Sequence, residues 1–369
     1  MAVEDNPVPS GDPQNAAPED ARVARFAFLR RPLSLAYAAF FVFLAAGAAA
    51  IEIAGSPADG SPVVSIGLLP FPSRSDAATV KLGTFQERRE FGGNLLGDPS
   101  LIETSPQGPL PRIAQDGRTP LKAYGRNFTS AGTSTGKKPK IALVLRGLGV
   151  GATQTNSALM QLAPEITLGF VPFAPELQSD IDKARGAGHE VLLEVPMEPF
   201  DFPDSDPGPH ALLVGASPDE NVKRLEWSLS RATGYMGVMN LLGGRFMGEE
   251  TAIEPVLAQV AKRGLMFFDN GASSSSVAVT SARHTRAALA TGTLAIDTVQ
   301  TQAALDSKLA ELENAARQDG YAIGVASAYP ITIARLAEWT ATAEARGFQL
   351  VPLSALAVQQ VQQSAKAGE

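Results

Sequence analysis

"IALVLRGLGVG" at residues 141–151 decides the fold of the folded region. Its five apolar residues at 141–145 are typical of a strand buried on both faces. The glycines that follow are typical of a tight turn from a strand into a helix. Arg146 is the charged residue at the end of this strand. The stretch therefore predicts a parallel strand that ends in a basic side chain.

Further along the chain, apolar runs and helical segments alternate. Strand-like runs are expected at residues 140–145, 166–171, 189–195, 235–240, 265–270, 293–297, 321–327 and 348–353. Segments with helical spacing separate most of them, and Ser217 is a good N-cap for one. Such alternation indicates parallel strands covered by helices, in a (β/α) barrel or a doubly wound sheet.

Composition and charge exclude several classes of function. The 369 residues carry a net charge of -7, and nucleic-acid-binding proteins normally carry a basic excess instead. The chain contains no cysteine, which excludes thiolate nucleophiles, cysteine zinc sites and disulfides.

An apolar segment at residues 32–54 is long enough to cross a bilayer as one helix. Four arginines precede it, and the next basic residue after it is Arg74. This asymmetry predicts a single-pass anchor in the inner (cytoplasmic) membrane, with the N-terminus in the cytoplasm and the globular domain in the periplasm. A cleaved signal peptide and a buried core helix are the alternatives.

The remaining regions follow from composition. Residues 1–31 are expected to be a disordered cytoplasmic tail, 55–138 a spacer rich in Pro, Gly and Ser, 139–357 the globular domain, and 358–369 a flexible C-terminal tail. Two parts of the spacer, at 101–114 and 121–128, contain apolar and aromatic residues. They either dock on the domain or a partner, or are irregular loops.

In folds of parallel strands, chemistry lies at the carboxyl ends of the strands. The polar residues at these ends are Arg146, Glu194, Glu198, Asn240, Asp269, Asn270, Asp297, Ser327 and Tyr329. They would normally indicate an acid–base or metal site. However, the three histidines, His189, His210 and His284, do not end a strand. Trp227 and Trp339 either line a sugar platform or pack in the core.

Four ordered stretches resemble the divergent polysaccharide deacetylase family of bacterial envelope proteins. They are "KIALVLRGLG" (140–149), "GHEVLLEVPMEPFDFPDSDPGPHALL" (188–213), "GVMNLLGGRF" (237–246) and "RGLMFFDNG" (263–271). The resemblance covers about residues 139–355. It implies an irregular (β/α) barrel of the carbohydrate deacetylase type, here preceded by one transmembrane helix and a long spacer.

The family's metal chemistry depends on positions where this chain departs from it. Arg146 and Gly147 match a pair of aspartates, Leu241 matches a ligand histidine, and Ser327 and Tyr329 match two further histidines; Asp269, Asn240 and Arg245 are retained. A deacetylase metal polarises the acetyl carbonyl and activates water, and arginine cannot coordinate a cation. The resemblance therefore implies no metal and no cofactor here.

Three interpretations of Arg146 remain. It forms a structural ion pair with Asp269 or Glu194, it binds an anionic or hydroxyl-rich ligand, or it belongs to an altered hydrolytic site. The pattern G-x-G-x-x-A from Gly147 to Ala152 is a weak dinucleotide motif, and proline stands where the second strand should carry an acid.

Two functions stay open. In the first, a membrane-anchored envelope protein has lost metal-dependent deacetylase activity and binds a glycan or an envelope protein. The ligand-binding candidates are Arg146, Glu198, Asn240, Arg245, Asn270 and Tyr329. In the second, the protein is an active carbohydrate deacetylase or hydrolase that uses Asp269 and Glu194 as catalytic residues.

Overall fold

The computed structural model describes residues 97–126 and 138–357. The expected cytoplasmic tail, the expected anchor at 32–54, residues 55–96 of the expected spacer and the C-terminal tail lie outside the described residues. Within the described ranges, no helix is both long enough and apolar enough to cross a membrane.

A nine-stranded parallel sheet forms the centre of the domain. Its hydrogen-bonded order is β8-β7-β6-β5-β4-β3-β10-β9, and β11 pairs with β3. The strands are β3 (Lys140–Leu148), β4 (Thr167–Phe170), β5 (Val191–Met197), β6 (Gly237–Leu242), β7 (Met266–Asp269), β8 (Ala288–Thr291), β9 (Leu294–Ala295), β10 (Tyr321–Ser327) and β11 (Gln349–Leu350). Every pairing within this sheet is parallel.

The two ends of this strand order are joined by a short piece of chain. Only Gly292 and Thr293 separate β8, which pairs with β7, from β9, which pairs with β10. The Gly292 amide donates to the Asp269 carbonyl at 2.8 Å, and the Thr293 amide donates to the Ile323 carbonyl at 2.8 Å. The sheet therefore curls into a half-barrel, which fits the deacetylase-like barrel that the sequence led us to expect.

Alternation along the strands separates an inner from an outer face. On β3, Ala142 and Val144 belong to the apolar cluster inside the barrel, which also contains Leu192, Met239, Phe268 and Val325. The residues between them, Ile141, Leu143 and Leu145, belong to the larger cluster that packs against the helices. Both faces are apolar, which explains the unbroken hydrophobic run at 141–145.

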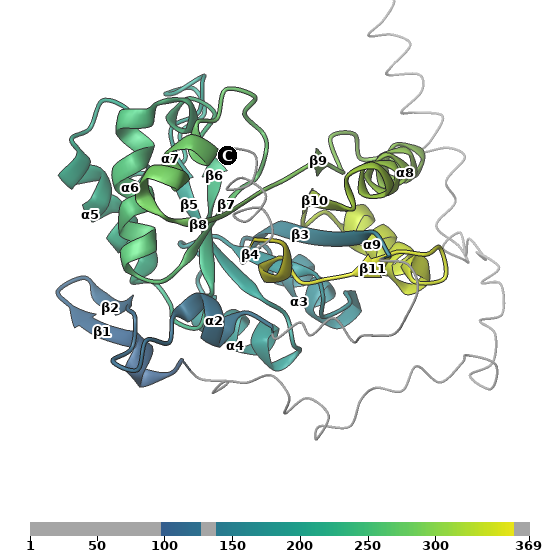
Figure 1. Ribbon diagram of the computed structural model, residues 1–369, viewed down its shortest axis with the longest axis horizontal. Helices are drawn as coiled ribbons and strands as arrows, with labels where there is room; N and C mark the ends of the chain where they lie inside the picture. The colour runs from purple at the N-terminus through teal and green to yellow at the C-terminus, as the bar shows by residue number, and fades with distance from the viewer. Residues whose placement is uncertain (1–96, 127–137, 358–369) are drawn as a thin grey trace, which may run out of the picture. The chain divides into compact units, whose positions relative to one another are not determined.

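Helices lie around the outside of the sheet (Figure 1). They are α3 (Ala152–Gln161), α4 (Leu177–Gly186), α5 (Pro218–Leu229), α6 (Glu250–Lys262), α7 (Ala278–Thr285), α8 (Gln302–Asp319) and α9 (Pro330–Ala343), with a 3-10 turn η5 (Phe246–Gly248) before α6. The Ser217 hydroxyl accepts from the Glu220 amide at 3.2 Å, which confirms the predicted N-cap of α5.

The stretch that was expected to be spacer is folded at residues 97–126. It contains η4 (Pro99–Leu101), an antiparallel hairpin of β1 (Ile102–Ser105) and β2 (Gly108–Pro111), and α2 (Pro120–Tyr124). Leu101, Ala114 and Tyr124 join the cluster inside the barrel. The folded unit thus begins before residue 139, because these apolar side chains cover core that β3–β11 leave exposed.

Two buried charged side chains fasten this stretch to the domain. Arg263 donates to Glu103 Oε1 at 2.7 Å and to the Pro111 carbonyl at 2.9 Å. Glu190, just before β5, accepts from the Arg126 amide at 2.7 Å and from the Ser354 amide at 3.1 Å. These contacts hold the stretch near the end of the barrel where the strands begin.

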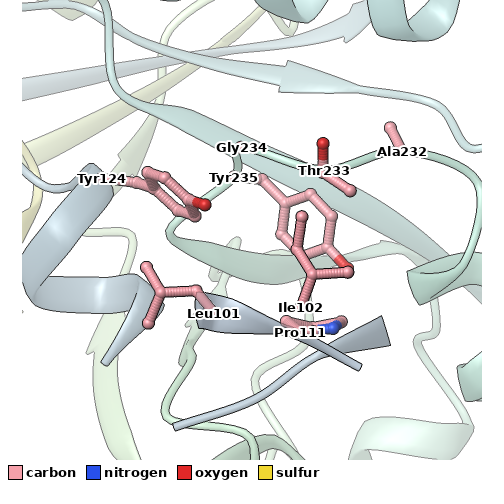
Figure 2. Close-up of a pocket in the computed structure, with 8 residues that line it drawn as sticks. All are labelled: Leu101, Ile102, Pro111, Tyr124, Ala232, Thr233, Gly234 and Tyr235. Carbon is pink, nitrogen blue, oxygen red and sulfur yellow. The ribbon is translucent and has the colours of Figure 1, made fainter. Parts of the chain in front are cut away.

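A narrow crevice lies between the hairpin and the start of β6, lined by apolar residues and two tyrosines (Figure 2). The Tyr124 hydroxyl accepts from the Asp98 amide, and the Tyr235 hydroxyl donates to the Leu229 carbonyl. Its free volume of about 10 Å³ is that of one water molecule. The crevice is therefore a packing gap and too small for a ligand.

Candidate functional site

The end of the barrel where the strands finish, here called the mouth, carries three inward-facing polar positions. Arg146 continues the inner series of Ala142 and Val144 on β3, Glu194 follows Leu192 on β5, and Ser327 follows Val325 on β10. On β4, a Cβ at Gly169 would lie 3.3 Å from Glu194 Oε1 and 3.4 Å from Arg146 Cα. Arg146 and Glu194 are therefore neighbours inside the mouth.

Glu194 is completely buried and only half hydrogen-bonded. Its Oε1 accepts from the Gly147 amide at 2.5 Å, whereas Oε2 has no hydrogen-bond partner among the described residues. Burial raises the pKa of Glu194 to about 7, and the Gly147 hydrogen bond and the charge of Arg146 oppose this rise. This carboxyl therefore exchanges its proton near neutral pH.

Asp297, which follows β9, is a second carboxyl near Arg146. Its Oδ2 accepts from the Ser327 amide at 2.6 Å and from the Thr332 hydroxyl at 3.3 Å. Burial raises the pKa of Asp297, while these two hydrogen bonds and the charge of Arg146 lower it. The sequence places Asp297 at a strand end, but only the closure of the barrel through β9 brings it beside β3.

The expected ion pair of Arg146 does not form. In the described ranges its guanidinium has no carboxylate oxygen within 4.0 Å and no hydrogen-bond acceptor, although it lowers the pKa values of Glu194 and Asp297 through space. Asp269 is not its neighbour on the inner face, because β7 places Phe268 inside and Asp269 outside. Arg146 is partly exposed.

The side chains of Asp269, Asn240 and Asn270 form hydrogen bonds within the loops that follow β6 and β7. Asp269 accepts from the Gly271 amide at 3.0 Å and from the Ser276 hydroxyl at 2.6 Å. Asn240 Oδ1 accepts from the Asn270 amide, and its Nδ2 donates to the Leu242 carbonyl. All these groups are satisfied internally, which is typical of turns held in place by side chains.

The other expected ligand-binding residues are on the loops of the mouth. Glu198 is buried, and its carboxylate accepts from Arg245 Nη1 at 2.7 Å and from the Val214 amide at 2.7 Å. Arg245 is half exposed, and Tyr329 is exposed just before α9. Glu198 therefore joins two loops, while Arg245 and Tyr329 remain accessible.

The residues at the mouth do not fit the metal site that the fold family implies. Arg146 is cationic, Leu241 packs against the outer apolar cluster, and both oxygens of Asp269 are already hydrogen-bonded on the other face of β7. Glu194 and Asp297 alone do not supply the three or more protein donors of a catalytic zinc site. Elsewhere in the described residues, Glu250, Glu254 and His284 cluster on α6 and α7, where His284 Nδ1 lies 3.5 Å from Glu250 Oε1 and 3.8 Å from Glu254 Oε1.

Exposed apolar side chains lie at the same end of the sheet as this polar centre. Most of the large exposed hydrophobic residues stand at or shortly after the carboxyl ends of strands: Val150, Phe173, Phe200, Leu242, Val299, Tyr329 and Ile331. The tryptophans are not part of this rim. Trp227 is stacked on His210 at 3.6 Å, and Trp339 is buried and donates to Glu313. The mouth thus combines an apolar rim with a few convergent polar groups, as small-molecule sites commonly do.

Comparison with known proteins assigns the family. The model of the divergent polysaccharide deacetylases matches residues 143–357. The chain belongs to this family. Membership supports a function related to carbohydrate, as the resemblance of the four stretches implied.

Three relatives of this deacetylase-like chain illustrate the match. It is 22% identical over 194 residues to the uncharacterized protein YibQ of Escherichia coli K12, which covers 53% of this chain and 60% of that protein. It is 22% identical over 197 residues to an uncharacterized protein of Haemophilus influenzae, covering 53% and 69%. A crystal structure of an uncharacterized protein from Agrobacterium tumefaciens C58 is 40% identical, with a TM-score of 0.65, and covers 68% of this chain and 99% of that one.

Proposed function

We propose that this protein binds an envelope glycan at the mouth of its deacetylase-like barrel and does not carry out metal-dependent deacetylation. The observation that carries the proposal is the inner end of β3, where a partly exposed arginine replaces the acidic residue that metal chemistry requires. Arg146 cannot act as a general base or as a ligand, because its guanidinium stays protonated.

The apolar rim supports a sugar ligand. Aromatic rings such as Phe173, Phe200 and Tyr329 pack against the C–H faces of a sugar, while central polar groups bind its hydroxyls. Phe200 is held over the loop after β6, since a Cβ at Gly244 would lie 2.6 Å from its ring. Part of the rim is therefore fixed in place before a ligand arrives.

The test separates binding from catalysis. The full chain, purified in detergent, is titrated with fragments of envelope polysaccharide and assayed for acetate release with and without added Zn²⁺. We expect saturable binding, weakened by Phe200→Ala, and no acetate release under either condition. Zinc-dependent acetate release that Asp269→Ala abolishes would show instead that the second function, an active deacetylase with unusual residues, is correct.

The proposal also covers the location of the protein in the cell. The apolar segment at 32–54 and the arginines before it favour an inner-membrane anchor with a periplasmic domain. Fusions of alkaline phosphatase after residue 60 should be active, and the mature protein should keep its own N-terminus. Recovery of a soluble protein that begins near residue 50 would show a cleaved signal peptide.

A further inference from the structure

The charged side chain of Arg146 makes no ion pair or hydrogen bond that stabilises the described fold. Its backbone is committed to the sheet, because its carbonyl accepts from the Ala328 amide at 2.9 Å. Its guanidinium has neither an ion pair nor a hydrogen bond with any described residue. By contrast, Arg245 across the mouth pairs with Glu198, and Arg263 donates to three acceptor atoms. The five N–H donors of Arg146 remain available.

The two carboxyls near Arg146 are oriented by other donors. Glu194 is held by the Gly147 amide, and Asp297 by the Ser327 amide and the Thr332 hydroxyl. Burial raises the pKa of both carboxyls, to about 7 for Glu194. Near neutral pH the negative charge of Glu194 is therefore incomplete, so it does not fully offset the positive charge of Arg146.

There is space beside this arginine. The adjacent Gly147 has a φ of +81°, and a Cβ built on it would meet no heavy atom within 4 Å. On the β4 side the packing is close, because a Cβ at Gly169 would lie 2.8 Å from Met239 Sδ and 3.4 Å from Arg146 Cα. The open volume next to Arg146 therefore lies on the Gly147 side.

An unpaired guanidinium beside open volume selects for a planar anion. Arginine binds a carboxylate through two parallel N–H···O bonds, which gives both affinity and orientation. The apolar rim lowers the local dielectric and strengthens such a pair relative to one in water. A neutral sugar would leave the guanidinium without an equivalent partner.

We propose that the glycan bound at the mouth is acidic, and that Arg146 binds its carboxylate. This inference rests on the proposed function and adds the ligand class. Two sources supply this chemistry: the C6 carboxylate of a uronic acid, and the lactyl carboxylate of a muramic-acid unit. In both, hydroxyls next to the carboxylate can donate to the carboxyl group of Asp297.

The experiment measures dissociation constants by calorimetry with the full chain in detergent. The probes are oligosaccharides of a uronic acid, a muramic-acid disaccharide, and the same two compounds with the carboxylate reduced to an alcohol. We expect one acidic probe to bind roughly 10- to 100-fold more tightly than its reduced form. Which acidic probe shows this preference identifies the source.

Variants assign the preference to Arg146. Arg146→Gln should reduce the ratio between acidic and reduced probes to about one while keeping affinity for the reduced probe, since the rim remains. Arg231→Gln is the matched control, because this arginine lies over the Trp227 ring and not at a strand end. It should keep the ratio of the parent protein.

The outcomes separate the two proposals. Equal binding of acidic and reduced probes, weakened by Phe200→Ala, would overturn the acidic ligand and leave glycan binding standing. A preference that survives in Arg146→Gln would assign the carboxylate to another cation. Binding of none of the probes by the folded protein would overturn both proposals.

Discussion

The Gly147 amide donates to Glu194 Oε1 at 2.5 Å, and this bond joins the carboxyl end of β3 to the middle of β5. It fixes the strand end that carries Arg146 to a carboxyl that is completely buried. The second oxygen of that carboxyl has no partner among the described residues. The bond therefore relates the position of the arginine to the protonation of Glu194.

Glu194→Gln should change the pH dependence of stability. Because burial raises the pKa of Glu194 from 4.5 to about 7, the folded state binds this proton more tightly than the unfolded state does. The stabilisation is fully present below the pKa of the unfolded state and is lost as pH rises through the pKa of the folded state. Relative to the variant, the parent protein should lose about 3 kcal/mol of unfolding free energy between acidic and mildly basic pH.

Urea unfolding of both proteins at several pH values measures this difference. Glu311→Gln, a change on the exposed face of α8, controls for general effects of charge. If the free energies of the parent and of Glu194→Gln run parallel across this range, Glu194 does not titrate as described.

Arg263→Ala should detach the hairpin of β1 and β2. The arginine side chain is 9% exposed and holds Glu103, Glu226 and the Pro111 carbonyl. Removing it leaves these acceptors without their donor, and we expect a loss of about 2 kcal/mol in unfolding free energy. Arg118→Ala removes two ion pairs of an arginine that is 49% exposed, and it should cost much less, because solvent screens these pairs.

Limited proteolysis gives a second measurement of the same contact. Cleavage within residues 97–118 should accelerate in Arg263→Ala and stay unchanged in Arg118→Ala. Equal behaviour of the two variants would mean that apolar contacts alone hold the hairpin.

Gly292→Ala should weaken the closure of the barrel. A Cβ at this position would lie 2.7 Å from the Asn270 carbonyl oxygen and 2.7 Å from Val325 Cγ2. Because one of these atoms belongs to the backbone, relief requires a shift of the chain between β8 and β9, and we expect about 2 kcal/mol of destabilisation. Gly186→Ala at the end of α4 meets no heavy atom within 4 Å and should be neutral or stabilising by up to about 1 kcal/mol.

Asp269→Ala tests whether the retained aspartate serves structure or chemistry. Loss of acceptors for the Gly271 amide and the Ser276 hydroxyl should lower stability by about 1–2 kcal/mol. Glycan affinity should change by less than about twofold, since Asp269 faces away from the interior of the barrel. A large loss of affinity with little loss of stability would place Asp269 in the binding site after all.

Much of the fold followed from local pattern. Buried runs such as 140–145 and 321–327 became β3 and β10, and the capping serine at 217 began α5. The strand at 288–291 was not expected, because its sequence "ALAT" contains mainly residues with weak strand preference. Its pairing with β7 depends on where the chain runs after α7, which local pattern does not contain.

The sequence predicted which residues lie at the site better than it predicted the contacts between them. Placing Arg146 and Glu194 at strand ends required only the order of strands and loops. The pairing of Glu198 with Arg245, and of Asn240 with Asn270, depends on which loops lie side by side, and the sequence does not show that. Asp269 was grouped with Arg146 because both end strands, yet the alternation of β7 points it to the opposite face.

The sequence by itself determined that the first parallel strand ends in an arginine, at a position where the family carries an acidic residue. Strand runs, turns and residue types are local properties of the sequence. Only the tertiary structure decided that this arginine is left unpaired. Whether a guanidinium meets a carboxylate depends on strand alternation and on closure through Gly292. Both are properties of the whole barrel, and they separate Arg146 from Asp269 while bringing it close to Glu194 and Asp297.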